Sequence, residues 1–140
     1  MGTMDKRIIK FIKKHHLLSL ATSSDNVPYS SSCFYIYLEI ENMLIFASEE
    51  KTKHIQDCLK QPIVAGTIAL ESILITKIKG VQFKGNIIEI TDDSLREKYI
   101  KRFPLALFIS FKLWGIELNY IKMTDNSFGF GEKLIWEKGL

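Results

Sequence analysis

The period of the apolar positions changes along the chain, and the first segment has the period of a helix. Residues 4–16 read MDKRIIKFIKKHH. Apolar and basic residues separate onto two faces of this segment, which predicts a short amphipathic helix with Asp5 as its N-cap. The apolar face consists of Ile8, Ile9, Phe11 and Ile12, and the basic face of Lys6, Lys10, Lys13 and Lys14.

Most of the other apolar segments have the alternation, or the short continuous run, that is typical of strands. The polar pair Glu41–Asn42 joins two of them into a hairpin. Gly80 and Gly85 predict a bulge or bend in the longest one. The predicted strands cover 17–23, 29–40, 43–48, 63–70, 73–91, 113–125 and 133–137, and 105–111 is expected to be a short strand or a loop.

Two helical patterns interrupt these strands. Residues 50–61 end before Pro62, and residues 91–103 end before Pro104. The sequence thus has about six strands, mostly in meander order, and helices occur only at the ends of the chain and at the crossings between strands. This order predicts a mainly β fold, namely a small closed antiparallel barrel with peripheral helices.

Length and composition add limits to this picture. The length argues for a single domain over 1–140, and Met1–Thr3, which precede a second methionine, are left out of the fold prediction. The net charge of +3 fits an anionic ligand but is no nucleic-acid signature. Cys33 and Cys58 form no CxxC pair, so we expect reduced, buried thiols in a cytoplasmic protein. No segment resembles a membrane span or a signal peptide, and no metal site is predicted.

The segment FASEEKTKHIQDCLKQP, residues 46–62, gathers small polar and cationic groups where a strand passes into a helix. A helix N-terminus exposes unpaired N–H groups, so the hydroxyls of Ser48 and Thr52 with two nearby lysines would suit a phosphate. The alternative is a capped surface helix, with Ser48 as the N-cap, two glutamates in the first turn and solvated lysines. Composition alone favours the alternative, because such helix starts are common.

The same segment resembles the one that follows the third strand in the pyridoxamine 5′-phosphate oxidase-like, FMN-binding split β-barrels. In that family, a phenylalanine is followed by a hydroxyl residue two positions on, by a group such as Ser-Arg-Lys six to eight positions on, and by a proline at sixteen. This chain has Phe46, Ser48, Thr52-Lys53-His54 and Pro62 at those positions. The resemblance implies that Ser48, Thr52, Lys53 and His54 hold the FMN phosphate.

The resemblance covers the chain from about Ile8 to Trp136. The segments SSCFY and LNYIKMTDNSFGFGEKLIW are similar to the uncharacterised YhbP-like (UPF0306) group within that superfamily. The resemblance implies a split β-barrel and a homodimer with the flavin between the subunits.

Some positions depart from the true pyridoxamine phosphate oxidases. Those enzymes carry an arginine and a lysine in the second strand, where this chain has SSSCFY, and their C-terminal arginine and histidine have no match in FGFGEK. Pyridoxamine phosphate oxidation is therefore not predicted. The phosphate would rest on Lys53, His54 and the hydroxyls.

Two further groups of residues are candidates for contact with the flavin ring. Ser31, Ser32 and Cys33 are small, which would let a flat ring lie against the backbone; alternatively they form an exposed strand face with Cys33 as a small buried residue. By the resemblance, Trp114 would cover the ring from the partner subunit. Burial in the core of its own chain is the alternative.

These observations favour a flavin-dependent oxidoreductase of unknown small-molecule substrate that binds FMN at a homodimer interface. The alternative is a non-catalytic binding module for flavin, haem or another anionic ring ligand. The basic first helix is short and the net charge is modest, so we expect the lysines of this helix to face solvent rather than nucleic acid or a membrane. No nucleic-acid or membrane partner is predicted.

Overall fold

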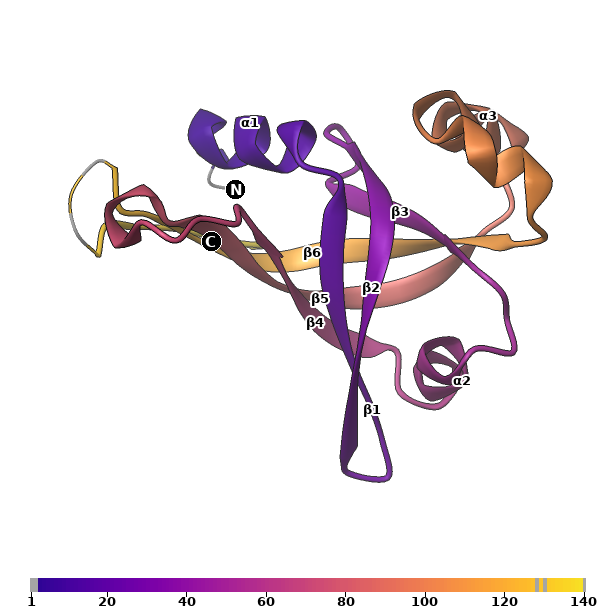
Figure 1. Cartoon of the computed structure of the whole chain (residues 1–140). Helices are drawn as coiled ribbons and strands as arrows, with labels where there is room; N and C mark the ends of the chain where they lie inside the picture. The colour runs from indigo at the N-terminus through magenta and orange to yellow at the C-terminus, as the bar shows by residue number, and fades with distance from the viewer. Residues whose placement is uncertain (1–2, 128, 130, 140) are drawn as a thin grey trace.

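A computed structural model describes residues 3–127, 129 and 131–139 as a closed antiparallel β-barrel (Figure 1). Seven strands form one sheet in the order β3-β2-β1-β4-β5-β6-β7, and a further pairing of β3 with β6 closes the first six. The predicted fold class is therefore confirmed. The strands are β1 (Leu17–Ser24), β2 (Val27–Leu38), β3 (Met43–Ser48), β4 (Ile63–Ala69), β5 (Lys79–Ile90), β6 (Lys112–Asp125) and β7 (Lys133–Glu137). Met1, Gly2, and Phe128 and Phe130 of the FGFGEK segment, lie outside the described residues.

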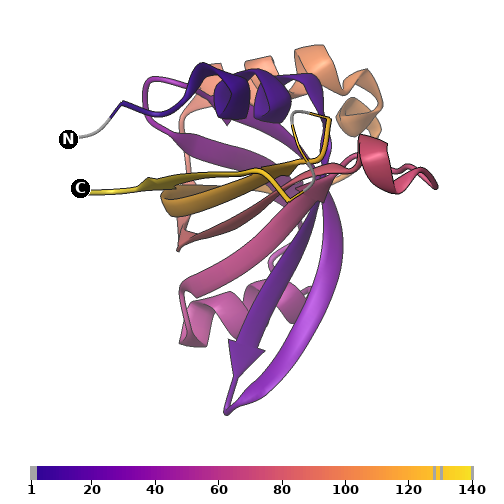
Figure 2. The same ribbon diagram turned by 90° about the vertical axis from the view of Figure 1, so that its left-hand side faces the viewer.

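The described part of the chain has three α-helices on the outside of the barrel, α1 (Lys6–Lys14), α2 (Lys53–Lys60) and α3 (Asp93–Arg102). Helices α1 and α3 lie over one side of the barrel and α2 lies near the other (Figures 1 and 2). Asp5 caps α1, as predicted, because its carboxylate accepts the backbone N–H of Arg7 at 2.8 Å. The hydroxyl of Tyr35 donates to the carbonyl of Ile12 at 2.7 Å and thereby ties α1 to β2.

Two predicted strand segments are instead 3₁₀-helices. The prediction of one strand over 73–91 was wrong at its start, since η1 (Ile75–Lys77) precedes β5. No sheet neighbour buries this start, and Ile73 is 97% exposed. Of the two expectations for 105–111, the strand was wrong, because η2 (Pro104–Phe108) lies there. Pro104 stands at the beginning of η2, where its fixed φ favours a helical turn and its missing N–H is not needed.

The bulge predicted near the glycines is confirmed at one of them. The register between β5 and β6 shifts between Lys84 and Gly85. A Cβ at Gly85 would lie 2.4 Å from the carbonyl oxygen of Glu117, so only glycine fits this close approach of two backbones.

Alternation along β2 divides the protein into two hydrophobic clusters. Cys33 and Tyr35 face the inside of the barrel and belong to its main core. Ile36 faces outward and packs with Tyr99 of α3 in a second, smaller core. Because α3 covers only part of the outer face of β2, outward residues of that strand such as Ser32 and Phe34 remain exposed.

Candidate ligand-binding site

The chain between β3 and α2 forms a turn before the helix begins. The hydroxyl of Thr52 donates to the carbonyl of Glu49 at 2.9 Å, and α2 starts only at Lys53. Thr52 is the N-cap, but its side chain makes no capping hydrogen bond. The alternative in which Ser48 caps the helix was therefore wrong, because Ser48 is the last residue of β3 and the turn separates it from α2.

Three of the four residues expected to hold phosphate lie together at this turn. The hydroxyl of Ser48 is 2.8 Å from Nε2 of His54 and 3.2 Å from the hydroxyl of Thr52. His54 is half-buried, and this burial lowers its pKa, although the carboxylate of Asp57 opposes the shift. The polar cluster Ser48–Thr52–His54 therefore offers hydroxyls and a neutral imidazole near pH 7, which can donate hydrogen bonds to an anion.

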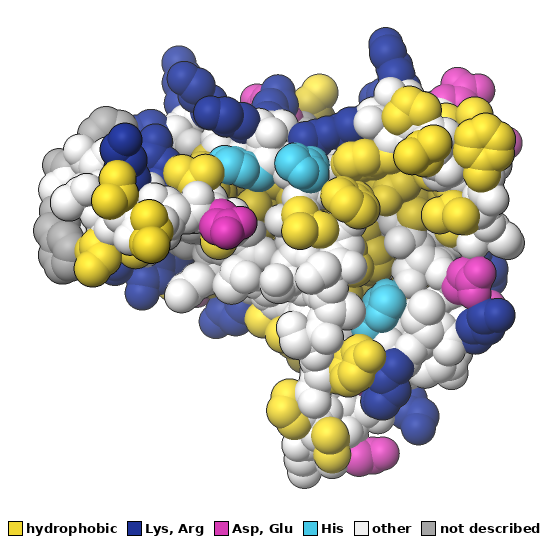
Figure 3. Space-filling view, in the orientation of Figure 1, with side chains coloured by type: hydrophobic (Ala, Val, Ile, Leu, Met, Phe, Trp, Pro, Cys, Tyr) yellow, Lys and Arg dark blue, Asp and Glu magenta, His cyan; other side chains and the backbone are white. Residues whose placement is uncertain are grey.

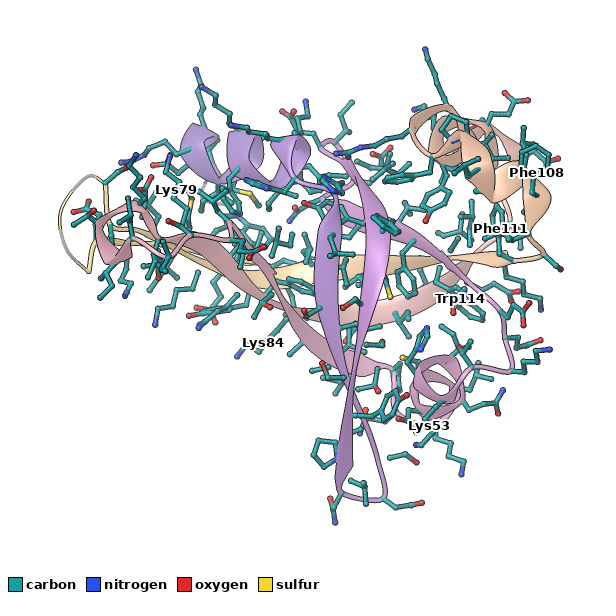
Figure 4. The ribbon with its side chains drawn as sticks, in the orientation of Figure 1. Lys53, Lys79, Lys84, Phe108, Phe111 and Trp114 are labelled. Carbon is teal, nitrogen blue, oxygen red and sulfur yellow. The ribbon has the colours of Figure 1, made fainter. Side chains whose placement is uncertain are left out.

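The fourth residue, Lys53, points to a different partner. Its ammonium forms an ion pair with Asp57, one helical turn on, and lies 5.6 Å from the ring centre of Tyr29. The Asp57 side chain is 3% exposed, and its other oxygen accepts the hydroxyl of Thr22 at 3.1 Å. The hydrogen bond from Lys53, followed by that from Thr22, lowers the pKa of Asp57. Lys53, labelled beside α2 in Figure 4, would have to share a phosphate with this buried carboxylate.

The serine-rich part of β2 presents two different faces. Ser32 and Phe34 point outward and are exposed, whereas Ser31 and Cys33 point inward. The buried hydroxyl of Ser31 makes no well-formed hydrogen bond to a described residue, although it lies close enough to the Cys33 thiol to stabilise the thiolate slightly. Burial dominates and raises the pKa of Cys33 to about 11. Cys33 is therefore a protonated, buried thiol rather than a nucleophile.

A cavity of about 560 Å³ opens beside these residues, between β2, β3, α3 and η2. In the space-filling view, hydrophobic side chains gather around a hollow below α3 (Figure 3). The cavity includes two of the expected ring-contact residues, Ser32 and Cys33. Its lining consists of Ser32, Cys33, Phe34, Ala47, Tyr99, Arg102, Phe103, Pro104, Leu105, Ala106 and Ile109.

Hydrogen bonds hold the α3 wall of the cavity in place. The hydroxyl of Tyr99 donates to the carbonyl of Phe34 at 3.0 Å. Arg102 donates from Nη2 to the carbonyl of His15 at 2.7 Å and from Nη1 to that of Tyr35 at 3.3 Å. The sequence did not identify Tyr99 or Arg102 as site residues, since helical periodicity shows that α3 packs on the barrel but not where.

Trp114 is 3% exposed and belongs to the barrel core. Its indole N–H donates to the carbonyl of Ser48 at 3.0 Å, so it fixes the end of β3 below the polar cluster. Of the two alternatives for this residue, the structure agrees with burial in its own chain.

Within the described residues, no group of three or more His, Cys, Asp or Glu side chains could hold a metal ion. None of the helices in that part of the chain has the length and apolar composition needed to cross a membrane.

Solved structures place the fold in a known class. A protein assigned as a pyridoxamine 5′-phosphate oxidase from Listeria innocua matches with a TM-score of 0.73, over 87% of this chain and 98% of that one. An FAD-binding protein from Mesorhizobium loti matches with 0.70, over 86% and 94%, and a haem-binding protein from Mycobacterium smegmatis with 0.76, over 98% and 60%. Sequence identities are 16%, 16% and 13%, so these matches show the fold alone. The protein therefore has the split β-barrel fold of these structures.

Curated relatives then define the family. A UPF0306 protein from Yersinia pseudotuberculosis is 39% identical over 134 residues, which are 94% of this chain and 91% of the relative. A UPF0306 protein from Photorhabdus laumondii is 37% identical over 134 residues, 94% of each chain. No family model matches the sequence. The chain belongs to the UPF0306 family.

Proposed function

We propose that this protein binds FMN, with the phosphate at Ser48, Thr52 and His54 and the ring along β2 at Ser32 and Cys33. The observation that carries the proposal is the position of the polar cluster directly beside the apolar cavity. Ala47 lines the cavity and the next residue, Ser48, belongs to the cluster. One ligand with an anionic tail and a flat, mostly apolar ring would span both.

The residues present fit such a ligand. A cavity of about 560 Å³ lies within the range of roughly 300–1,000 Å³ that is usual for small-molecule sites. The hydroxyls and the imidazole suit a phosphate monoester, and the α2 N-terminus, without a side-chain cap, adds its positive dipole end.

The protein then acts as a flavin-dependent oxidoreductase on a small molecule that is not yet known. A bound flavin supplies the redox chemistry, while this chain binds the phosphate, orients the ring and limits access of water. A homodimer would cover the apolar residues that η2 exposes, among them Leu105 at 79% and Phe108 at 83% (Figure 4). Two buried, free cysteines support a cytoplasmic location.

A second candidate is a non-catalytic module that binds flavin, haem or another anionic ring compound. The pairing of Lys53 with Asp57 favours it, because it weakens the grip on phosphate. A fold relative named for haem binding is consistent with it.

Absorption spectroscopy tests both candidates. The purified protein should bind added FMN with a shift of the flavin spectrum, and an oxidoreductase should bleach the bound flavin when NADH or NADPH is added. Binding without bleaching by either donor would favour the non-catalytic module. A protein that binds no FMN would refute the flavin proposal in both forms.

Replacement of Lys53 tests whether this lysine takes part in the phosphate site. Lys53→Ala alone would leave the buried Asp57 carboxylate unpaired, so the informative variant is Lys53→Ala with Asp57→Asn, compared with Asp57→Asn alone. If Lys53 contacts phosphate, its loss should weaken FMN binding by about 1.5–3 kcal/mol, the range for hydrogen bonds to charged groups. Equal FMN affinity of the two variants in a calorimetric titration would return Lys53 to a structural role.

A further inference from the structure

The outer face of β2 carries two hollows in a row. Ser32 and Phe34 line the apolar cavity, and the next outward residues, Ile36 and Leu38, line a second hollow of about 330 Å³. Successive outward residues of a strand lie about 7 Å apart. The two hollows are therefore neighbours, and Arg102 lines both of them.

The second hollow is basic, whereas the cavity is apolar. Its charged lining residues are Lys13 of α1 and Lys98, Lys101 and Arg102 of α3. Lys13 pairs with Glu39 at 2.6 Å. Within the described residues, Lys98 and Lys101 form no ion pair, so both ammonium groups are open to an anionic ligand.

The helix itself accounts for some of these cations. Lys101 and Arg102 lie in the last turn of α3, where a positive charge is favourable next to the negative end of the helix dipole. The same explanation covers Lys13, which lies in the last turn of α1, but it does not extend to Lys98, which precedes the last turn of α3. The four cations converge from two helices on one side of an apolar cavity.

We propose that the apolar cavity and the basic hollow bind an amphipathic organic anion, with its apolar body against the packed rings of Phe34 and Phe103 and its acid group at Lys98 and Lys101. Charge complementarity and the shared wall at Arg102 carry this assignment. The acid group would lie on the opposite side of the cavity from the Ser48–Thr52–His54 cluster, which leaves that cluster to the flavin phosphate. The assignment of such an anion as the substrate of the oxidoreductase rests on the proposed function. Binding of the anion to the two hollows requires no flavin.

A pair of fluorescent dyes tests the inference without flavin. The probes are 1-anilinonaphthalene-8-sulfonate, which carries a sulfonate, and N-phenyl-1-naphthylamine, its uncharged counterpart. Both should bind to the unmodified protein. The double variant Lys98→Gln/Lys101→Gln should weaken the sulfonate dye roughly five- to tenfold and leave the neutral dye unchanged. The matched control Lys6→Gln/Lys10→Gln removes two exposed lysines of α1 that do not line the second hollow, and it should change neither dye.

Several outcomes would overturn the inference. These are equal weakening of both dyes, an equal effect of the control variant, or failure of either dye to bind, as expected if a second copy of the chain fills the cavity. FMN titration of the same lysine variants separates the two proposals. If the lysine variant weakens only the sulfonate dye and the protein does not bind FMN, the anion site is supported and only the proposal of flavin binding is refuted.

Discussion

The two halves of the candidate site differ in chemistry and in how the chain builds them. The polar cluster at the start of α2 comes from one segment, and the separation from Ser48 to His54 is six residues. The cavity under α3 joins Phe34 with Tyr99, which are 65 residues apart in the sequence. The first half is polar and largely local, whereas the second is apolar and requires the closed barrel.

Because of this difference, each half of the candidate site can recognise a different part of a ligand. In the proposed function, the hydroxyls and the imidazole of the polar cluster would select for an anionic group through directed hydrogen bonds. The apolar cavity selects for shape and size, since its contacts have no direction. A ligand that needs both halves should respond to changes in either, and a ligand that needs one half should not.

The largest effect is expected from filling the cavity. Ser32→Trp places an indole on the exposed outer face of β2, where it would occupy the space proposed for the flavin ring. Overpacking of this kind costs about 1–3 kcal/mol, so FMN binding should weaken roughly 5- to 150-fold in a fluorescence titration. The polar cluster should not be affected.

Ser30→Trp is the matched control for this variant. Ser30 lies on the same exposed face of β2 but does not line the cavity. FMN affinity should stay close to that of the unmodified protein, and thermal unfolding should show that both variants are folded. If the two tryptophan variants weaken FMN equally, the ring does not lie in the cavity.

A smaller effect is expected at the polar cluster, and it should depend on pH. Burial lowers the pKa of His54 in the free protein, and a bound phosphate would favour the protonated imidazole. FMN affinity relative to riboflavin, which lacks the phosphate, should therefore rise roughly fivefold as the pH falls from about 8 to about 6. His54→Gln should remove this rise.

Stability should change in the opposite direction. Because the folded-state pKa of His54 lies below its ordinary value of 6.5, the unfolded chain takes up the proton first as the pH falls. His54 therefore lowers the free energy of unfolding below about pH 6.5, and His54→Gln should remove this loss in denaturant titrations.

In the FMN titrations, the phosphate of FMN also takes up a proton, with a pKa of about 6. It does so with the unmodified protein and with the His54→Gln variant alike. If the affinity of the variant for FMN relative to riboflavin depends on pH as it does in the unmodified protein, His54 does not contact the phosphate.

The sequence predicted the elements and the polar cluster because their signals are local. The β2–β3 hairpin follows from alternation around Glu41–Asn42, and the helix-start cluster follows from the resemblance of residues 46–62 to the phosphate segment of the split barrels. The direction of Lys53 could not be predicted. It depends on the buried Asp57 and on Thr22, which is 35 residues before that aspartate in the sequence.

The cavity could not be predicted for a related reason. Its walls meet only because β3 pairs with β6 and brings the segment that precedes β6 back to the barrel. Neither propensity nor periodicity contains that pairing. The 3₁₀-helix η2 was also missed as an element, since five residues that begin with a proline carry no helical period.

The smallest effect on FMN is expected at Trp114, whose indole joins the barrel core to the end of β3. Trp114→Phe keeps an aromatic ring but removes the hydrogen bond to the Ser48 carbonyl, so the free energy of unfolding should fall by about 1–2 kcal/mol. FMN affinity should change by less than roughly twofold, because the ring is 3% exposed and cannot touch a ligand in the cavity. A loss of FMN affinity as large as that of Ser32→Trp, with little loss of stability, would mean that Trp114 contacts the flavin after all, which would require the barrel to open at β6 when the ligand binds.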